Sequence, residues 1–130
     1  TALITACLDG YEHIVNFLIQ AGASVDQRGG YKNNTPLHVA VSLGHGHIVD
    51  SLIKAGANVD QCGGYRDWTP YISAIEGGHL EVAKILLSAG ADIKKCREKA
   101  LVLAAKNGDE EMIKRLIAAG ANIDRDATYG

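Results

Sequence analysis

TPLHVAVSLGHGHIVDSLIKAGANVD, residues 35 to 60, contains two short apolar segments with Gly-His between them and Ala-Gly-Ala near the end. The Ala-Gly-Ala triplet occurs four times in the chain, and a second series of glycines repeats its separations of 34, 34 and 30 residues. Two independent markers that keep one register indicate four copies of one structural unit. The triplet glycines are Gly22, Gly56, Gly90 and Gly120, and the second series is Gly10, Gly44, Gly78 and Gly108.

Each copy contains two segments with helical patterns. The first segments are Ala-rich and end at a glycine of the second series, which predicts a short helix closed by that glycine. They are LITACLD, LHVAVSL, YISAIEG and LVLAAKN. The second segments carry apolar residues at i, i+3, i+4 and i+7, which predicts an amphipathic helix that ends at Ala-Gly-Ala. In the first copy these residues are Ile14, Phe17, Leu18 and Ala21. A helix pair this short is marginal alone, so we expect neighbouring pairs to stack.

Residues 35 to 60 resemble the ankyrin repeat in the TPLHVA opening, the Gly-His between the helices and the GANV close. The likeness covers all four copies. It implies an all-α ankyrin-repeat solenoid of stacked helix-turn-helix pairs with short β-hairpin fingers. We expect a single domain over residues 1–130, with repeats at about 1–30, 31–64, 65–96 and 97–130. Because both boundaries cut through repeat units, we also expect a fragment of a longer array.

The outer copies depart from the family pattern. Thr1 opens the first copy, but Ala2 and Ile4 stand where the family has Pro and His. In the fourth copy, Lys99 and Ala100 replace Thr-Pro, and the connection before them is four residues shorter. In the family the threonine and histidine tie neighbouring loops, so we expect weaker clamping at both ends.

Composition narrows the class of protein. The chain has 130 residues, 22% of them charged, and a formal net charge of −2, so bulk electrostatics do not favour nucleic acid or a membrane surface. No apolar stretch reaches the roughly 18 residues of a membrane span. The three cysteines are odd in number and widely spaced, which fits reduced thiols. We therefore expect an intracellular protein of the cytoplasm or nucleus.

The candidate site lies in the connections between copies. DQRGGYKNNTP, residues 26 to 36, and DQCGGYRDWTP, residues 60 to 70, agree in residues that set backbone geometry and differ after Gly-Gly. The resemblance implies that such fingers, together with the exposed residues late in each first helix, bind partners. Tyr, Trp and Arg are also the residue types most enriched at binding hot spots. The late helix positions are Leu8, Asp9, Ser42, Leu43, Glu76, Gly77, Lys106 and Asn107.

We therefore predict a protein-protein interaction module for a partner protein or peptide. The expected partner-binding residues are Tyr31, Lys32, Asn34, Leu43, Tyr65, Arg66, Trp68 and Glu76. Two alternatives stay open. Trp68 and the finger tyrosines could instead pack on adjacent fingers and stiffen the array. The segment could also be a structural spacer of a longer array, with ligand binding elsewhere.

The sequence gives little support for catalysis, metal binding or nucleic acid binding. No serine lies in GxSxG and no Gly-Gly precedes GK[ST], so we expect no catalytic residues and no cofactor. His45 and His47 have no third metal ligand nearby in the sequence, so we expect no metal site there. Cys62 and Cys96 lie in loops of different length, so we expect no functional pair of thiols. The basic segment KKCREK, residues 94 to 99, is interrupted by Glu98 and reads as a solvated loop, so we expect no nucleic acid partner.

A further expectation concerns the ends of the stack. The second helices of the outer copies carry interior-type apolar residues where a capping repeat would have a polar outer face. We expect end-to-end self-association through these uncapped repeats. The residues are Ile14, Phe17 and Leu18 on one side and Ile113, Leu116 and Ile117 on the other.

Overall fold

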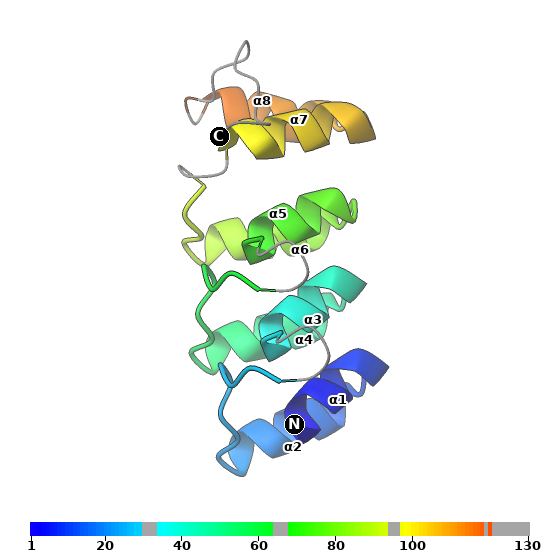
Figure 1. Cartoon of the computed structure of the whole chain (residues 1–130), viewed down its shortest axis with the longest axis vertical. Helices are drawn as coiled ribbons and strands as arrows, with labels where there is room; N and C mark the ends of the chain where they lie inside the picture. Colours follow the sequence, from blue (N-terminus) through cyan, green and yellow to red (C-terminus); the bar gives the residue numbers. More distant parts are fainter. Residues whose placement is uncertain (30–33, 64–67, 94–96, 119, 121–130) are drawn as a thin grey trace. The chain divides into compact units, whose positions relative to one another are not determined.

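The computed structural model describes residues 1–29, 34–63, 68–93, 97–118 and 120, and across these residues the regular structure is helical. Four helix pairs follow one another along the chain (Figure 1), and each predicted repeat range holds one pair. The all-α prediction is confirmed. The helices are α1 (Ala2–Asp9), α2 (Glu12–Gln20), α3 (Pro36–Leu43), α4 (Gly46–Lys54), α5 (Pro70–Glu76), α6 (Leu80–Ser88), α7 (Arg97–Asn107) and α8 (Glu110–Ala118).

The first helix of each of the first three pairs begins at a threonine cap. The Thr35 hydroxyl accepts a hydrogen bond from the His38 backbone N–H at 3.1 Å, and Pro36 then occupies the first turn. Thr69 caps α5 in the same way, and Thr1 caps α1. Because Ala2 stands where the family has proline, α1 lacks a proline in its first turn, but it keeps its threonine cap.

Glycine ends these helices through a left-handed backbone. Gly44 follows α3 with φ of 73°, a conformation that strains any residue with a Cβ, and its N–H closes the last turn. Gly10 does the same after α1. The helix α5 ends at Glu76, one residue before the position where α1 and α3 end, and its glycine with positive φ is Gly78. The predicted ends of α1 and α3 are thus confirmed, and α5 ends one residue before its predicted end.

The fourth pair differs from the prediction at its start. The helix was expected from Leu101, but α7 begins at Arg97 and runs for 11 residues. Without a Thr-Pro start, nothing fixes the first turn at Lys99, and the helix extends toward the amino end. Arg97 to Lys99 therefore belong to a helix, which corrects the interpretation of this part of the basic segment as a loop, and residues 94–96 lie outside the described residues.

The chain divides into two compact units, Thr1–Ala91 and Asp92–Gly130. In the first unit, α1, α3 and α5 pack in one row, and α2, α4 and α6 pack in a second row against it (Figure 1). Its core includes fully buried residues at matching positions of successive second helices. They are Val15, Val49 and Ala83 in one column and Leu52 and Leu86 in another.

In the second unit, α7 packs on α8, and Ala104, Met112 and Leu116 are buried. The assignment of all 130 residues to a single domain stays a prediction. No helix in the described ranges is long and apolar enough to cross a membrane.

The buried side of α2 is the one that carries Val15, which is fully buried. Ile14 and Phe17, predicted as apolar residues where a capping repeat would have a polar outer face, are 48% and 70% exposed. Because α2 contacts α1 and α4, the side of the helix that carries Val15 is the one that these neighbours cover.

Candidate partner-binding surface

The carboxyl ends of the first helices form an exposed row in the first unit. Since α1 packs beside α3 and α3 beside α5, these ends lie next to one another. Leu8 and Leu43 are 54% and 46% exposed, so the row offers two apolar side chains on adjacent helices. We call it the helix-end row: Leu8, Asp9, Ser42, Leu43, Glu76 and Gly77, all of them exposed. Lys106 and Asn107, in the second unit, are exposed as well.

Histidine-glycine contacts fix the spacing of this row. The His79 ring lies 3.2 Å, through Nε2, from the backbone oxygen of Ser42 in the preceding repeat. A Cβ on Gly44 would lie only 2.6 Å from Nδ1 of the same ring, so the close approach requires glycine. His45 lies against Gly10 in the same way, at 3.2 Å from such a Cβ. The ends of α1 and α3 are thereby held by the turn of the next repeat.

Asn34 and Trp68 lie at the base of the fingers. Gly29 and Asn34 exchange two backbone hydrogen bonds of 3.0 and 3.1 Å, and the Gly63 N–H donates to the Trp68 oxygen at 3.1 Å. Both residues are half-buried. Both were predicted as partner-binding residues in the variable part of the fingers, and the pairing places them where each finger closes. Tyr31, Lys32, Tyr65 and Arg66 lie outside the described residues.

Successive finger bases are linked by polar contacts that the sequence analysis missed. The Arg28 guanidinium donates a hydrogen bond to the Cys62 carbonyl, one repeat further on. The Asp26 carboxylate accepts one from the Asn58 N–H at 3.0 Å. Gly63 lies close to Arg28, since a Cβ there would be 3.1 Å from the guanidinium. The available signal was the difference between DQRGG and DQCGG, where Arg28 stands in one copy and Cys62 in the next.

The described cysteine and histidine side chains are the candidates for catalysis or metal binding, and their surroundings are those of structural residues. Burial raises the pKa of the Cys7 thiol to about 12, so it stays protonated and is a poor nucleophile near neutral pH. Cys62 is a free, half-buried thiol, and Cys96 lies outside the described residues. The His45 ring packs on Gly10. Within the ranges that the structure describes, no three His, Cys, Asp or Glu side chains are grouped to hold a metal ion.

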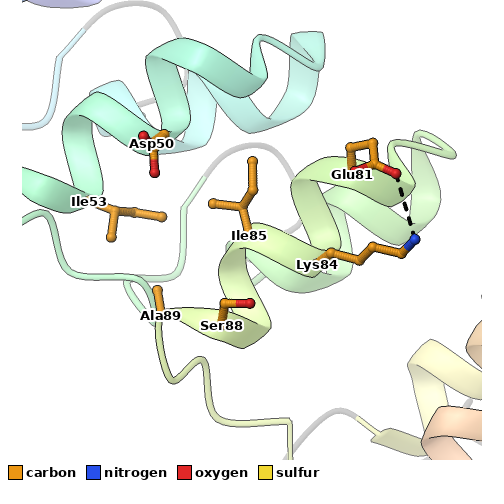
Figure 2. A pocket seen from close by; sticks show the side chains of 7 residues that line it. All are labelled: Asp50, Ile53, Glu81, Lys84, Ile85, Ser88 and Ala89. Atoms are coloured by element: carbon orange, nitrogen blue, oxygen red, sulfur yellow. Dashed lines mark ion pairs between the residues drawn. The ribbon is translucent and has the colours of Figure 1, made fainter.

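A second surface, not predicted from the sequence, lies between α4 and α6. Two adjoining hollows of about 350 and 540 Å³ share Asp50, Glu81 and Ile85. Figure 2 shows Ile53 and Ile85 pointing toward each other across the first hollow, and Lys84 paired with Glu81 at 3.6 Å. Gly46 lines the second hollow, where the other repeats carry Glu12, Leu80 and Glu110. The signal in the sequence for this hollow was Gly46, which leaves α4 without a side chain at this position.

The comparisons with known proteins agree with the repeat pattern. A family model described as ankyrin repeats (3 copies) matches residues 1–61 and 46–127. The two matches together span nearly the whole chain. A search of curated proteins gave no match.

Proposed function

The chain belongs to the ankyrin-repeat family, whose members are in general protein-protein interaction modules, and we propose that it binds a partner protein or peptide without catalysis of its own. The proposed surface combines the helix-end row with the two fingers that precede Pro36 and Pro70. The observation that carries the proposal is the row itself, in which Leu8 and Leu43 are exposed on adjacent helices whose ends lie against histidines of the next repeat.

The physical basis is preorganisation. A ligand that meets side chains on packed helices does not have to order them, so little of its binding energy is lost. Leu43 supplies apolar contact at the centre of the row, and Glu76 supplies a carboxylate at its edge. Trp68 is the only tryptophan of the chain, and its half-buried position leaves part of it to a ligand. Tyr31, Lys32, Asn34, Tyr65 and Arg66 complete the proposed site on sequence grounds.

The experiment is selection of peptides from a random display library on the 130-residue chain, followed by titration of the selected peptides. Isothermal titration calorimetry measures the binding of each peptide, so the same readout serves Trp68→Ala, which lacks the chain's only tryptophan. We expect Trp68→Ala to weaken binding by about 2 kcal/mol or more, with little change in the melting midpoint. Leu43→Asp should also weaken it, because a carboxylate replaces apolar contact. Lys54→Ala is the matched control, since this side chain is 76% exposed on α4 and lies outside the proposed site.

Each other outcome has a definite meaning. If Trp68→Ala lowers the melting midpoint while the folded fraction keeps its affinity, Trp68 packs the finger and the site assignment fails. If peptides bind equally well to Leu43→Asp, Trp68→Ala and the wild type, the partner-binding surface lies elsewhere. If no peptide is selected and a candidate partner protein also fails to bind, the alternative of a structural spacer in a longer array is favoured.

The proposed setting is a reducing compartment, the cytoplasm or the nucleus. Cys7 and Cys62 are free thiols, and an odd total of three cysteines does not make a closed disulfide framework.

A further inference from the structure

The two hollows between α4 and α6 form one groove inside the first unit. All of its lining residues belong to the second and third repeats, which are neighbours in this unit. Asp50, Glu81 and Ile85 belong to both hollows. We call this surface the α4–α6 groove, its 540 Å³ part the Gly46 hollow and its 350 Å³ part the Ile53 hollow. Both volumes lie within the range of about 300–1,000 Å³ that ligand pockets have.

Gly46 opens the larger hollow, and folding does not require glycine at this position. Gly46 is the first residue of α4 and is not one of the glycines with positive φ. A Cβ there would lie 3.8 Å from Cδ1 of Ile85, which is an ordinary van der Waals contact. The other repeats carry Glu12, Leu80 and Glu110 here. Neither the backbone nor packing explains the glycine, whereas a ligand side chain that occupies the hollow does.

The Gly46 hollow is acidic. Among the described residues, the carboxylates of Asp50 from α4 and Glu81 from α6 line it, and no lysine or arginine does. Lys84 lines only the Ile53 hollow. The same two positions between α2 and α4 carry Asn16 and His47. The pair of carboxylates is therefore a feature of this groove and not of the repeat in general.

Both carboxylates have lysine neighbours but keep acceptors for a ligand. Lys54, which lines neither hollow, lies 2.8 Å from Oδ2 of Asp50. Lys84 lies 3.6 Å from Oε1 of Glu81 (Figure 2), which is beyond hydrogen-bond range. A carboxylate has two oxygens and about four acceptor sites, and ion pairs between exposed side chains contribute little. A cation with several donors can therefore bond both carboxylates in spite of the lysines.

We propose that the α4–α6 groove binds an extended segment of a partner protein that carries an arginine two residues from a leucine. The arginine enters the Gly46 hollow, where its five N–H donors serve Asp50 and Glu81 together. The leucine enters the other hollow, where Ile53 and Ile85 point toward each other (Figure 2). The inference goes beyond the proposed function and does not rest on it, because the helix-end row lies on the first helices and this groove on the second.

The spacing of the two side chains follows from the helices. Along α4, Gly46 and His47 belong to one hollow only, Ile53 belongs to the other only, and Asp50 lies between them. The centres of the hollows are therefore about four residues apart, or about 6 Å at the helical rise of about 1.5 Å per residue. Alternate side chains of an extended chain stand on one face about 6–7 Å apart. One residue between the arginine and the leucine gives this spacing.

The test uses a blocked pentapeptide, Gly-Arg-Ala-Leu-Gly, titrated into the isotope-labelled chain and followed by NMR. A peptide with the order Leu-Ala-Arg is titrated in parallel, and binding of either order supports the proposal. The largest amide shifts should lie in α4 and α6, at His47, Asp50, Ile53, Glu81 and Ile85. A peptide with glutamine in place of arginine should bind at least about tenfold more weakly, because the charged hydrogen bonds are lost.

Two variants test the Gly46 hollow. Gly46→Leu fills it with the residue that Leu80 supplies in the next repeat, and Glu81→Gln removes one charge with little change of volume. Each should weaken peptide binding at least about tenfold. Glu110→Gln is the matched control, since Glu110 on α8 is 82% exposed, like Glu81 at 85%, and should leave binding unchanged. Circular dichroism melts check folding, and if Gly46→Leu does not fold, the comparison of Glu81→Gln with Glu110→Gln decides.

Each other outcome overturns the proposal in a distinct way. If neither peptide shifts the groove amides at millimolar concentration, the groove does not bind this segment. Shifts at Leu8 and Leu43 instead assign the peptide to the helix-end row, which contradicts this inference and leaves the proposed function standing. Equal binding of the glutamine peptide, or unchanged binding to folded Gly46→Leu, removes the arginine site. Groove shifts that depend on the concentration of the chain alone assign the groove to a second copy.

Discussion

Gly44 offers a test of the contact that holds the helix-end row. It has φ of 73°, and a Cβ there would lie 2.6 Å from Nδ1 of His79. Gly44→Ala therefore combines two costs, backbone strain and displacement of the histidine ring. Gly78→Ala is the matched control, because Gly78 has φ of 72° but a Cβ there meets nothing within 4 Å.

The magnitudes follow from the two costs. A left-handed backbone costs a residue with a Cβ about 1–2 kcal/mol, and both variants pay this. In Gly44→Ala the His79 ring must also move, which breaks its 3.2 Å contact with the Ser42 oxygen. A hydrogen bond of this type contributes about 1 kcal/mol. We therefore expect Gly78→Ala to lower the free energy of unfolding by about 1–2 kcal/mol and Gly44→Ala by about 2–3 kcal/mol, from the strain and hydrogen-bond terms above.

The assay is urea denaturation of the wild type, both glycine variants, His79→Ala and the double variant Gly44→Ala/His79→Ala. Without the ring, Gly44→Ala should cost only the strain, so the double-mutant cycle should give a coupling energy of about 1 kcal/mol. The reasoning is refuted if Gly44→Ala costs no more than Gly78→Ala. It is refuted equally if the excess persists in the His79→Ala background.

Two further predictions concern the core. Leu52→Ala should lower the free energy of unfolding by about 2–5 kcal/mol, because Leu52 is fully buried between neighbouring repeats, whereas Leu116→Ala should cost less and mainly loosen the fourth repeat; denaturant melts that show equal losses contradict this. For Cys7, the folded-state pKa of about 12 lies above the ordinary 9.0, so its contribution to stability is fully present below pH 9 and is lost as the pH rises toward 12. Wild-type stability should fall by up to about 1.4 kcal/mol per pH unit in that window from this group. Urea melts at pH 8, 9.5 and 11 should show a smaller fall in Cys7→Ala.

The sequence predicted the helix pairs because their boundaries depend on local chemistry. Thr35 and Pro36 start a helix, and Gly44 ends one, through hydrogen bonds and backbone angles within a few residues. The pattern was repeated along the chain, so each copy supported the others. Where the start signal was absent, before α7, the predicted boundary was wrong.

Features that depend on contacts between repeats were not predictable in the same way. Ile14, Val15, Phe17 and Leu18 are all apolar, so the pattern alone did not show that Val15 is the buried one. That choice depends on where α1 and α4 lie. For the same reason, the link from Arg28 to Cys62 joins residues one repeat apart, so its only signal was the difference between the two copies and not the residues around either position.

The positions that differ among repeats are the ones that packing leaves free. In the buried columns the residues stay small or branched and apolar, as in Val15, Val49 and Ala83, because a change of volume there opens a cavity or forces a clash. In the helix-end row, equivalent positions carry Leu8, Ser42 and Glu76, which differ in size, polarity and charge and are all exposed. Folding does not dictate these side chains. Substitutions in the row therefore test the proposed binding with little expected change in stability, whereas substitutions in the columns test stability, and a variant set that includes both separates the two effects.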